Sequence, residues 1–152
     1  MKDMQKAAER ILEAVKNGEQ ITVYGDYDVD GISASSLLYL YLQGLGAKVN
    51  TYIPKRKNEG YGLNNEALAA LVEAGTTLLV TVDCGISGVD EVAAAPAGLE
   101  IIITDHTRRR MFCRRLTRSL IRISATADIR LSIFPAWAWL LSCVRRCIRC
   151  SI

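Results

Sequence analysis

The chain has 152 residues, of which 50% are hydrophobic and 23% charged, and its formal net charge at pH 7 is +3. This length suits one domain with a core of its own, and the hydrophobic content excludes an intrinsically disordered chain. No apolar run reaches the roughly 18 residues that a membrane span needs, and residues 1–20 lack the apolar stretch of a secretory signal. We therefore expect a cytoplasmic protein that does not contact a membrane.

The charge is divided unevenly along the chain. Residues 1–106 carry 8 Lys and Arg against 15 Asp and Glu, whereas residues 107–152 carry 11 Arg against a single acid, Asp128. The second part has no Lys, Gly or Glu, and it holds both tryptophans and four of the five cysteines. Two compositions this different predict two parts of different origin, with a boundary at residue 106.

Helices and strands alternate along residues 1–106. Apolar residues at helical spacing predict a helix over 4–17, and a β-branched run predicts a strand over 21–25. The remaining predicted elements are a helix over 32–43, a strand over 47–54, a helix over 64–75, a strand over 76–83, a helix over 88–98 and a strand over 99–105. This alternation predicts an α/β fold with a mainly parallel sheet flanked by helices, followed by an irregular tail.

Three of the predicted strands end in an aspartate, namely Asp26, Asp83 and Asp105. The carboxyl ends of parallel strands lie along one edge of a sheet, where the loops form the usual binding crevice. We expect the following acidic and imidazole side chains to converge at that edge: Asp26, Asp28, Asp30, Asp83, Asp105 and His106.

The segment GDYDVDG, residues 25–31, invites comparison with a calcium-binding EF-hand loop. An EF-hand needs a Glu at loop position 12 and a helix before the loop, but position 12 is Leu37 and a strand is predicted before it. A second interpretation is capping, with Asp30 as the N-cap of the next helix and the other aspartates as solvated turn residues.

The third interpretation is a divalent-metal site. Clustered carboxylates repel one another by on the order of 1–4 kcal/mol per close pair, and bound cations relieve that repulsion. Oxygen ligands with one imidazole suit Mg²⁺ or Mn²⁺, and His106 favours Mn²⁺. Two such ions would support in-line hydrolysis of a phosphate ester. We expect Cys84 to be a small buried residue. We expect Gly25, Gly31 and Gly85 to allow tight turns and close approach of the backbone.

The segment PKRKNEGYG, residues 54–62, is basic within an acidic part of the chain. It is either a solvated loop or a substrate-binding loop. In the second case Lys55, Arg56 or Lys57 would contact phosphates and Tyr61 would stack on a base.

Four motifs resemble one known family in their order and spacing: VYGDYDVDGISA at 23–34, YIPKRKNEGYGLN at 52–64, VTVDCGIS at 80–87 and IIITDH at 101–106. They are similar to the RecJ exonucleases of the DHH phosphoesterase superfamily. The resemblance covers residues 1–106. It implies Mn²⁺- or Mg²⁺-dependent, 5′-to-3′ hydrolysis of single-stranded DNA in recombination and repair, by a two-metal site in the intact family.

The same resemblance implies roles for individual residues. The catalytic residues it implies are Asp28, Asp30, Asp83 and His106. The implied metal ligands, or their close neighbours, are Asp26, Asp28, Asp30, Asp83, Asp105 and His106. Arg56 resembles a substrate-side residue, beside Lys55 and Tyr61. The implied partner is single-stranded DNA, with other repair proteins for the intact enzyme, and we expect a monomer.

The sequence departs from the family at the motif that names the superfamily, because D-H-H is replaced by Asp105-His106-Thr107. Reading the codons one base out of frame from this point can give D-H-H-x-P-P-D-V-L-P-E, as the family is expected to continue. We therefore interpret 1–106 as a partial DHH domain and 107–152 as an out-of-frame tail. The alternatives for the tail are a basic nucleic-acid-binding arm or a zinc site at Cys143, Cys147 and Cys150.

With one histidine in the motif and without the later ligands and domains of the family, we expect little or no activity from this chain. Two other functions stay open. One is a different DHH phosphoesterase, acting on oligoribonucleotides or cyclic dinucleotides. The other is a non-catalytic nucleic-acid-binding fragment.

Overall fold

The structure is a computed structural model that describes residues 4–55, 62–105 and 120–124, the last range by its backbone alone. The elements in chain order are α1 (Met4–Asn17), β1 (Gln20–Gly25), α2 (Val29–Gly44), β2 (Lys48–Tyr52), α3 (Asn65–Glu73), β3 (Leu78–Val82), α4 (Val89–Ala93), β4 (Glu100–Asp105) and β5 (Leu120–Ser124). The predicted alternation of helix and strand over residues 1–106 is confirmed, and α4 is shorter than expected.

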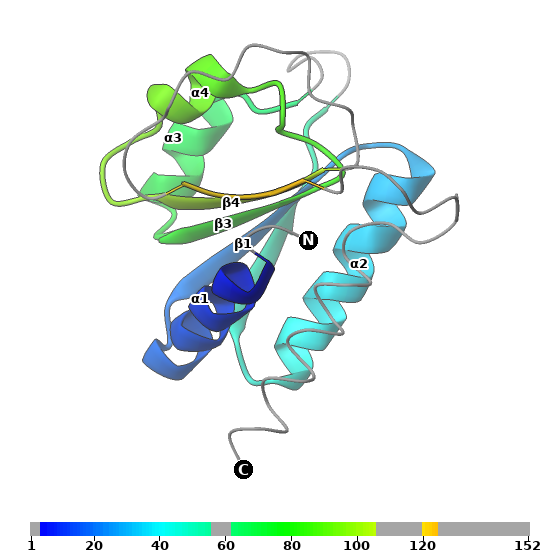
Figure 1. Cartoon of the computed structure of the whole chain (residues 1–152), viewed down its shortest axis with the longest axis vertical. Helices are drawn as coiled ribbons and strands as arrows, with labels where there is room; N and C mark the ends of the chain where they lie inside the picture. The colour runs from blue at the N-terminus through cyan, green and yellow to red at the C-terminus, as the bar shows by residue number, and fades with distance from the viewer. Residues whose placement is uncertain (1–3, 56–61, 106–119, 125–152) are drawn as a thin grey trace.

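The strands form one sheet in the order β2-β1-β3-β4-β5, and every neighbouring pair is parallel. Helices α1 and α2 cover one face of this sheet, and α3 and α4 cover the other (Figure 1). The prediction of an α/β fold with a parallel sheet flanked by helices is therefore confirmed. None of the helices in the described part of the chain is long and apolar enough to cross a membrane.

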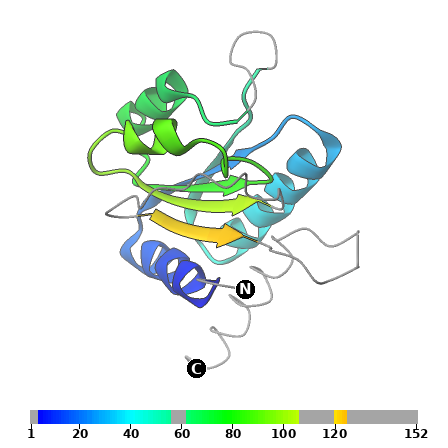
Figure 2. The same ribbon diagram turned by 45° about the horizontal axis from the view of Figure 1, so that its top comes forward.

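Strand β5 lies within the part of the chain that was expected to be irregular. Leu120–Ser124 pair with Ile101–Asp105 of β4, and Figure 2 shows the two strands running in the same direction. The prediction is therefore wrong for this segment. The physical reason is that β4 would otherwise end the sheet with unpaired backbone groups, and Ile121 and Ile123 favour an extended backbone. Residues 106–119 and 125–152, which hold the rest of the tail, lie outside the described residues.

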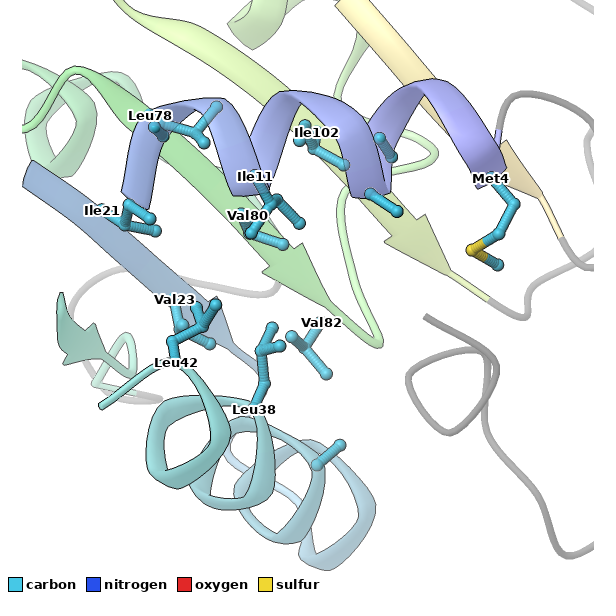
Figure 3. Packing of buried hydrophobic residues seen from close by; sticks show 14 residues of the cluster. Met4, Ile11, Ile21, Val23, Leu38, Leu42, Leu78, Val80, Val82 and Ile102 are labelled. Carbon is cyan, nitrogen blue, oxygen red and sulfur yellow. The ribbon is translucent and has the colours of Figure 1, made fainter. Parts of the chain in front are cut away.

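The first core layer lies between the sheet and the helices α1 and α2. Ile11 of α1 packs toward Val80 and Ile102, while Leu38 and Leu42 of α2 lie against Val23 and Val82 (Figure 3). These side chains are at most 1% exposed. Full burial of each large apolar side chain contributes about 1.5–3 kcal/mol, so this layer fixes both helices on the sheet.

The second layer packs the opposite face of the sheet against α3 and the loops beside it. Its largest fully buried side chains are Tyr24 of β1, Leu68 of α3, Leu79 of β3 and Ile103 of β4. Every residue of β3 is buried, which explains its nearly all-apolar sequence, LLVTV. Because both faces of the central strands are packed, the strand ends form a fixed edge on which loop residues are displayed.

Candidate active site

The carboxyl ends of β1, β3 and β4 bring three aspartates to one edge. Gly25 of β1 is paired with Val82 of β3, and Val82 is paired with Thr104 of β4. The next residue of each strand is Asp26, Asp83 and Asp105, respectively. The parallel register thus places three carboxylates from distant parts of the sequence at equivalent positions. Their role as metal ligands stays a prediction.

Asp26 is a buried carboxylate, with 4% of its surface exposed. Its Oδ1 accepts a hydrogen bond of 2.7 Å from the backbone N–H of Tyr27. Burial raises the pKa of Asp26, and the charges of Asp28 and Asp105 raise it further, while the Tyr27 N–H acts in the opposite direction. The ionised form of Asp26 is therefore disfavoured, and a cation at this edge would stabilise it.

Asp105 ties the end of β4 to the loop after β3. It is 3% exposed, and its Oδ2 accepts a hydrogen bond of 3.1 Å from the backbone N–H of Ile86. The hydroxyl of Thr81 in β3 donates to the carbonyl of Cys84 in that loop at 2.8 Å, and Gly85 of the loop has a φ of +98°. The orientation of the Asp105 carboxylate is thus set by the backbone of a neighbouring loop.

Asp83 has a φ of +60°, the only positive value among the non-glycine residues that the structure describes. A left-handed backbone in such a residue costs on the order of 1–3 kcal/mol, and it persists where the surrounding structure enforces it. Such residues cluster at active sites and ligand clamps. The strain at Asp83 therefore agrees with a functional role for this strand end.

Asp28 is the N-cap of α2, since its Oδ1 accepts a hydrogen bond of 2.7 Å from the backbone N–H of Gly31. The prediction that Asp30 fills this role is wrong, because Asp30 lies in the first turn of the helix. An N-cap carboxylate reaches the N–H three residues further on, so α2 begins at Val29 and not at Ile32. Both aspartates are exposed, and β1 precedes this turn, unlike the helix of an EF-hand.

Two glycines let the start of α2 approach the end of β1, as the sequence predicts. A Cβ atom on Gly31 would lie 2.6 Å from the carbonyl oxygen of Asp26 and 2.8 Å from its Cβ. A Cβ atom on Gly25 would lie 2.1 Å from the hydroxyl of Ser35, which is buried in α2. Asp28 therefore lies near Asp26 because no side chain separates the helix from the strand.

Cys84 has the character of a small core residue, as expected. It is 1% exposed, and its Sγ lies 3.7 Å from the carbonyl oxygen of Tyr24. Burial raises the pKa of this thiol, and the nearby charges of Asp105 and Asp26 raise it further. The thiolate form is therefore disfavoured, which agrees with a small core residue.

Carboxylate oxygens are the ligands that a hard divalent cation prefers. Such a cation would also offset the repulsion between the buried carboxylates of Asp26 and Asp105. Among the described residues, however, no three His, Cys, Asp or Glu side chains form a group that could hold a metal ion. His106, Arg56 and Tyr61 lie outside the described residues. The structure describes Lys55, which is exposed just after β2.

Tyr24 is a residue that the sequence analysis did not single out. Its side chain is fully buried on β1, and its hydroxyl donates a hydrogen bond of 3.0 Å to the carbonyl of Gly62. One signal could have identified it, since a tyrosine two residues before Asp26 points to the same side of the strand and needs a partner for a buried hydroxyl.

Comparison with known proteins gives one consistent result. Residues 20–131 match the DHH family, N-terminal domain, and this chain belongs to that family. The chain is 48% identical over 107 residues to the single-stranded-DNA-specific exonuclease RecJ of Bacillus subtilis, covering 70% of this chain and 14% of the relative. The corresponding exonuclease of Thermus thermophilus is 41% identical over 107 residues, covering 70% of this chain and 16% of the relative.

Solved structures agree with the sequence comparison. A crystal structure of exonuclease RecJ bound to manganese superposes with a TM-score of 0.83 at 31% identity, covering 97% of this chain and 38% of that one. RecJ of Thermus thermophilus in complex with Mn²⁺ superposes with a TM-score of 0.76 at 28% identity, covering 98% of this chain and 22% of that one. This chain therefore covers at most 38% of the length of any of these relatives and solved structures. The family match runs past His106 to residue 131, and the boundary at 106 stays a prediction.

Proposed function

We propose that this chain carries part of the metal-dependent site of a single-stranded-DNA-specific exonuclease that degrades DNA from 5′ to 3′. One observation carries the proposal: neighbouring parallel strands deliver Asp26, Asp83 and Asp105 to one edge of the sheet. The support from relatives is the 48% identity to an exonuclease with this specificity and the likeness to RecJ structures that contain manganese. A cytoplasmic role in recombination and repair, as a monomer, belongs to the same proposal.

Mn²⁺ or Mg²⁺ would be held by carboxylates of this edge: Asp26, Asp28, Asp30, Asp83 and Asp105, with His106. When bound, such ions lower the pKa of a water molecule and neutralise charge that develops on the phosphate. The protein's own contribution is orientation. Backbone N–H groups of Tyr27, Gly31 and Ile86 each hold one aspartate carboxylate in a fixed direction. Preset carboxylates need little rearrangement when the substrate arrives.

Substrate contact is assigned to the segment that follows β2. Lys55 is exposed there, and the sequence adds Arg56, Lys57 and Tyr61. Cationic side chains attract the phosphate backbone without reading its sequence, and an aromatic ring offers a stacking surface for a base. These are the interactions that an exonuclease without sequence preference needs.

We also propose that this chain by itself has little exonuclease activity. Thr107 stands where the family motif has a second histidine, and the composition changes abruptly at the same point. A one-base deletion near the codon of His106 accounts for both features. Residues 107–152 are then an out-of-frame tail and not a native domain.

The experiment compares three proteins in Mn²⁺ with 5′-labelled single-stranded DNA: this chain, its Asp28→Asn variant, and a chain whose D-H-H reading frame is restored by one inserted base. We expect almost no release of mononucleotides from the first two. Robust release that depends on Asp28 in the 152-residue chain would contradict the inactivity proposal. Faster hydrolysis of competing oligoribonucleotides by any of the three would contradict the DNA assignment.

A further inference from the structure

The hydroxyl of Thr81 connects the turn after β3 to the neighbouring strand β4. It donates to the carbonyl of Cys84, three residues further along the chain, at 2.8 Å. It also accepts a hydrogen bond of 3.2 Å from the backbone N–H of Thr104 in β4. Thr81 is fully buried, so water does not compete for these two bonds. One hydroxyl therefore holds the backbone of two separate segments.

Thr104 forms a further hydrogen bond to Thr81. Its hydroxyl donates to the carbonyl of Thr81 at 2.6 Å, and Thr104 is only 1% exposed. This bond comes in addition to the parallel pairing of β3 with β4, in which Val82 is the partner of Thr104. Asp105 is the residue that follows Thr104. The end of β4 is thus fixed to β3 directly before the Asp105 carboxylate.

The turn that Thr81 holds contains Asp83, whose φ is +60°. The hydrogen bond from Thr81 to Cys84 spans this residue. A left-handed backbone in a non-glycine residue persists only where the surrounding structure enforces it. Gly85 also lies against Thr81, since a Cβ atom on Gly85 would be 3.3 Å from the Thr81 Oγ1 and 3.5 Å from its Cγ2. Thr81 therefore contacts the two residues that directly follow Asp83.

The same turn reaches the carboxylate of Asp105. The backbone N–H of Ile86 donates to the Asp105 Oδ2 at 3.1 Å. Thr81 is therefore connected to Asp105 in two ways, through the adjacent Thr104 and through the turn that carries Ile86. We propose that Thr81 is a positioning residue, whose hydroxyl fixes the carboxylates of Asp83 and Asp105 relative to each other.

The inference rests on the proposed function where it treats Asp83 and Asp105 as ligands of a divalent cation. Groups that orient metal ligands affect the affinity for the metal without contacting it. The positioning itself is a property of the metal-free chain and does not depend on that function. It can therefore be tested first without any metal.

Packing alone is the competing explanation, because the methyl group of Thr81 also lies close to Gly85. Valine at position 81 keeps the shape of the side chain and removes the hydroxyl, whereas serine keeps the hydroxyl and removes the methyl group. If Thr81 only fills space, valine preserves the turn and serine disturbs it. If the hydroxyl positions the turn, serine preserves it and valine disturbs it.

The first test is amide hydrogen exchange of the full chain without metal, followed by nuclear magnetic resonance. Thr81→Val should raise the exchange rate of the Ile86 amide about 3- to 10-fold, the size that the loss of one net hydrogen bond implies. Thr81→Ser should leave that rate unchanged. The Tyr27 amide, which donates to Asp26 at 2.7 Å, is the reference position and should exchange equally in all variants.

Thr22→Val is the matched control. Thr22 is a fully buried threonine of β1, and its hydroxyl lies 2.8 Å from the hydroxyl of Thr76, away from the carboxyl edge. The substitution removes a buried, hydrogen-bonded hydroxyl as Thr81→Val does. We expect it to lower the melting temperature and to leave the exchange rate of the Ile86 amide unchanged.

An unchanged Ile86 rate in Thr81→Val would overturn the proposal, and so would a rate that rises by the same factor at Ile86 and at Tyr27, because the effect would then be global. Faster exchange at Ile86 in Thr81→Ser would overturn it as well, in favour of packing. The serine variant gives this decision even if the valine variant does not fold.

The second test is titration of Mn²⁺ into the original chain and the three variants, followed by electron paramagnetic resonance. We expect Thr81→Val to bind Mn²⁺ about 10-fold more weakly, the lower end of what the loss of a group that orients metal ligands costs. Thr81→Ser and Thr22→Val should bind it as the original chain does. A loss of stability alone would not separate the two valine variants in this way.

The two tests distinguish a failure of this inference from a failure of the proposed function. Equal Mn²⁺ affinity of the original chain and Thr81→Val would overturn the role of Thr81 in the site. No binding of Mn²⁺ by the original chain, together with the expected exchange rates at Ile86, would uphold the positioning of the turn and contradict the metal site assigned under the proposed function.

Discussion

Asp83 shows how single residues at this edge combine strain with charge. Its φ of +60° is a conformation that asparagine adopts about as readily as aspartate, whereas most side chains do not. Conversion to asparagine therefore separates the backbone requirement from the charge. The same reasoning applies to Gly31, where the requirement is space: the carbonyl oxygen of Asp26 would lie 2.6 Å from an added Cβ.

For Asp83→Asn, we expect a melting temperature close to that of the original chain and an affinity for Mn²⁺ that falls at least about 10-fold, as loss of a charged ligand oxygen implies. Differential scanning fluorimetry and Mn²⁺ titration followed by electron paramagnetic resonance provide the two readouts. Asp90→Asn, at an exposed position of α4, is the control and should change neither. Undiminished Mn²⁺ affinity in Asp83→Asn would remove this residue from the site.

For Gly31→Ala, we expect a loss of about 1–3 kcal/mol in the free energy of unfolding, because the added methyl group meets backbone atoms of Asp26 that cannot rotate away. Urea denaturation measures it. Gly44→Ala on the same helix is the matched control: a Cβ there would meet nothing within 4 Å, and the change should stabilise by about 0.5–1 kcal/mol. Equal effects of the two substitutions would contradict the close approach of α2 to β1.

At the scale of the elements, Arg10 joins α1 to the amino ends of two strands. Its Nη2 lies 2.7 Å from Glu19, which precedes β1, and its Nε donates to Glu100 at the start of β4. The hydrogen bond from Arg10 lowers the pKa of Glu19, and burial opposes that shift only in part. Both side chains of the Arg10–Glu19 pair are about 20% exposed, so solvent screens the pair only partly.

A lowered pKa means that the folded state binds the Glu19 proton less readily than the unfolded state does. The stabilisation that the Arg10–Glu19 pair contributes is fully present at pH values above the usual pKa of a glutamate. It is lost as the pH falls through the lowered pKa of Glu19. We expect Arg10→Met to reduce stability at pH 7 by about 1 kcal/mol and to make the loss between about pH 7 and pH 3 smaller. Urea denaturation at both pH values measures this. Lys16→Met, at an exposed position of α1, is the control, and an unchanged pH dependence in Arg10→Met would contradict the account.

The elements also show which features the sequence makes predictable. Strand β3 was predictable because a strand buried on both faces is nearly all apolar, and α3 because Asn64 and Gly75 mark its ends. The start of α2 was not, since Asp28 and Asp30 have equal capping propensity, and only the hydrogen bond from the Gly31 N–H to Asp28 in the structure identifies the N-cap. Strand β5 was missed because its pairing depends on the edge of β4, which precedes it by a long connection.

At the scale of the whole molecule, the parallel topology is what assembles the candidate site. The alternation of strands and helices predicted that Asp26, Asp83 and Asp105 share one edge, and the register places them there. The sequence could not reveal the tie between Tyr24 and Gly62, because it joins a strand to a distant loop through one hydroxyl. Roles for His106, Arg56 and Tyr61 stay predictions, as these residues lie outside the described ranges.

The two-part composition of the chain gives a prediction about its gene. We expect resequencing to find one additional base near the codon of His106, which would restore D-H-H and replace the arginine-rich residues that follow. The physical basis is that 11 arginines and no lysine or glycine in residues 107–152 is a composition unlike that of residues 1–106. An intact frame through that codon, with the same tail, would contradict this origin.

Binding of a divalent cation at the carboxyl edge is the property on which the proposed function depends most. Titration of Mn²⁺ into the chain and into Asp105→Asn, followed by electron paramagnetic resonance, tests it most directly. Asparagine keeps the oxygen that accepts from the Ile86 N–H and removes the charge, so the fold should survive. We predict that the original chain binds Mn²⁺ and that Asp105→Asn binds it at least about 10-fold more weakly. Equal binding by the two proteins, or none by the original chain, would contradict the account.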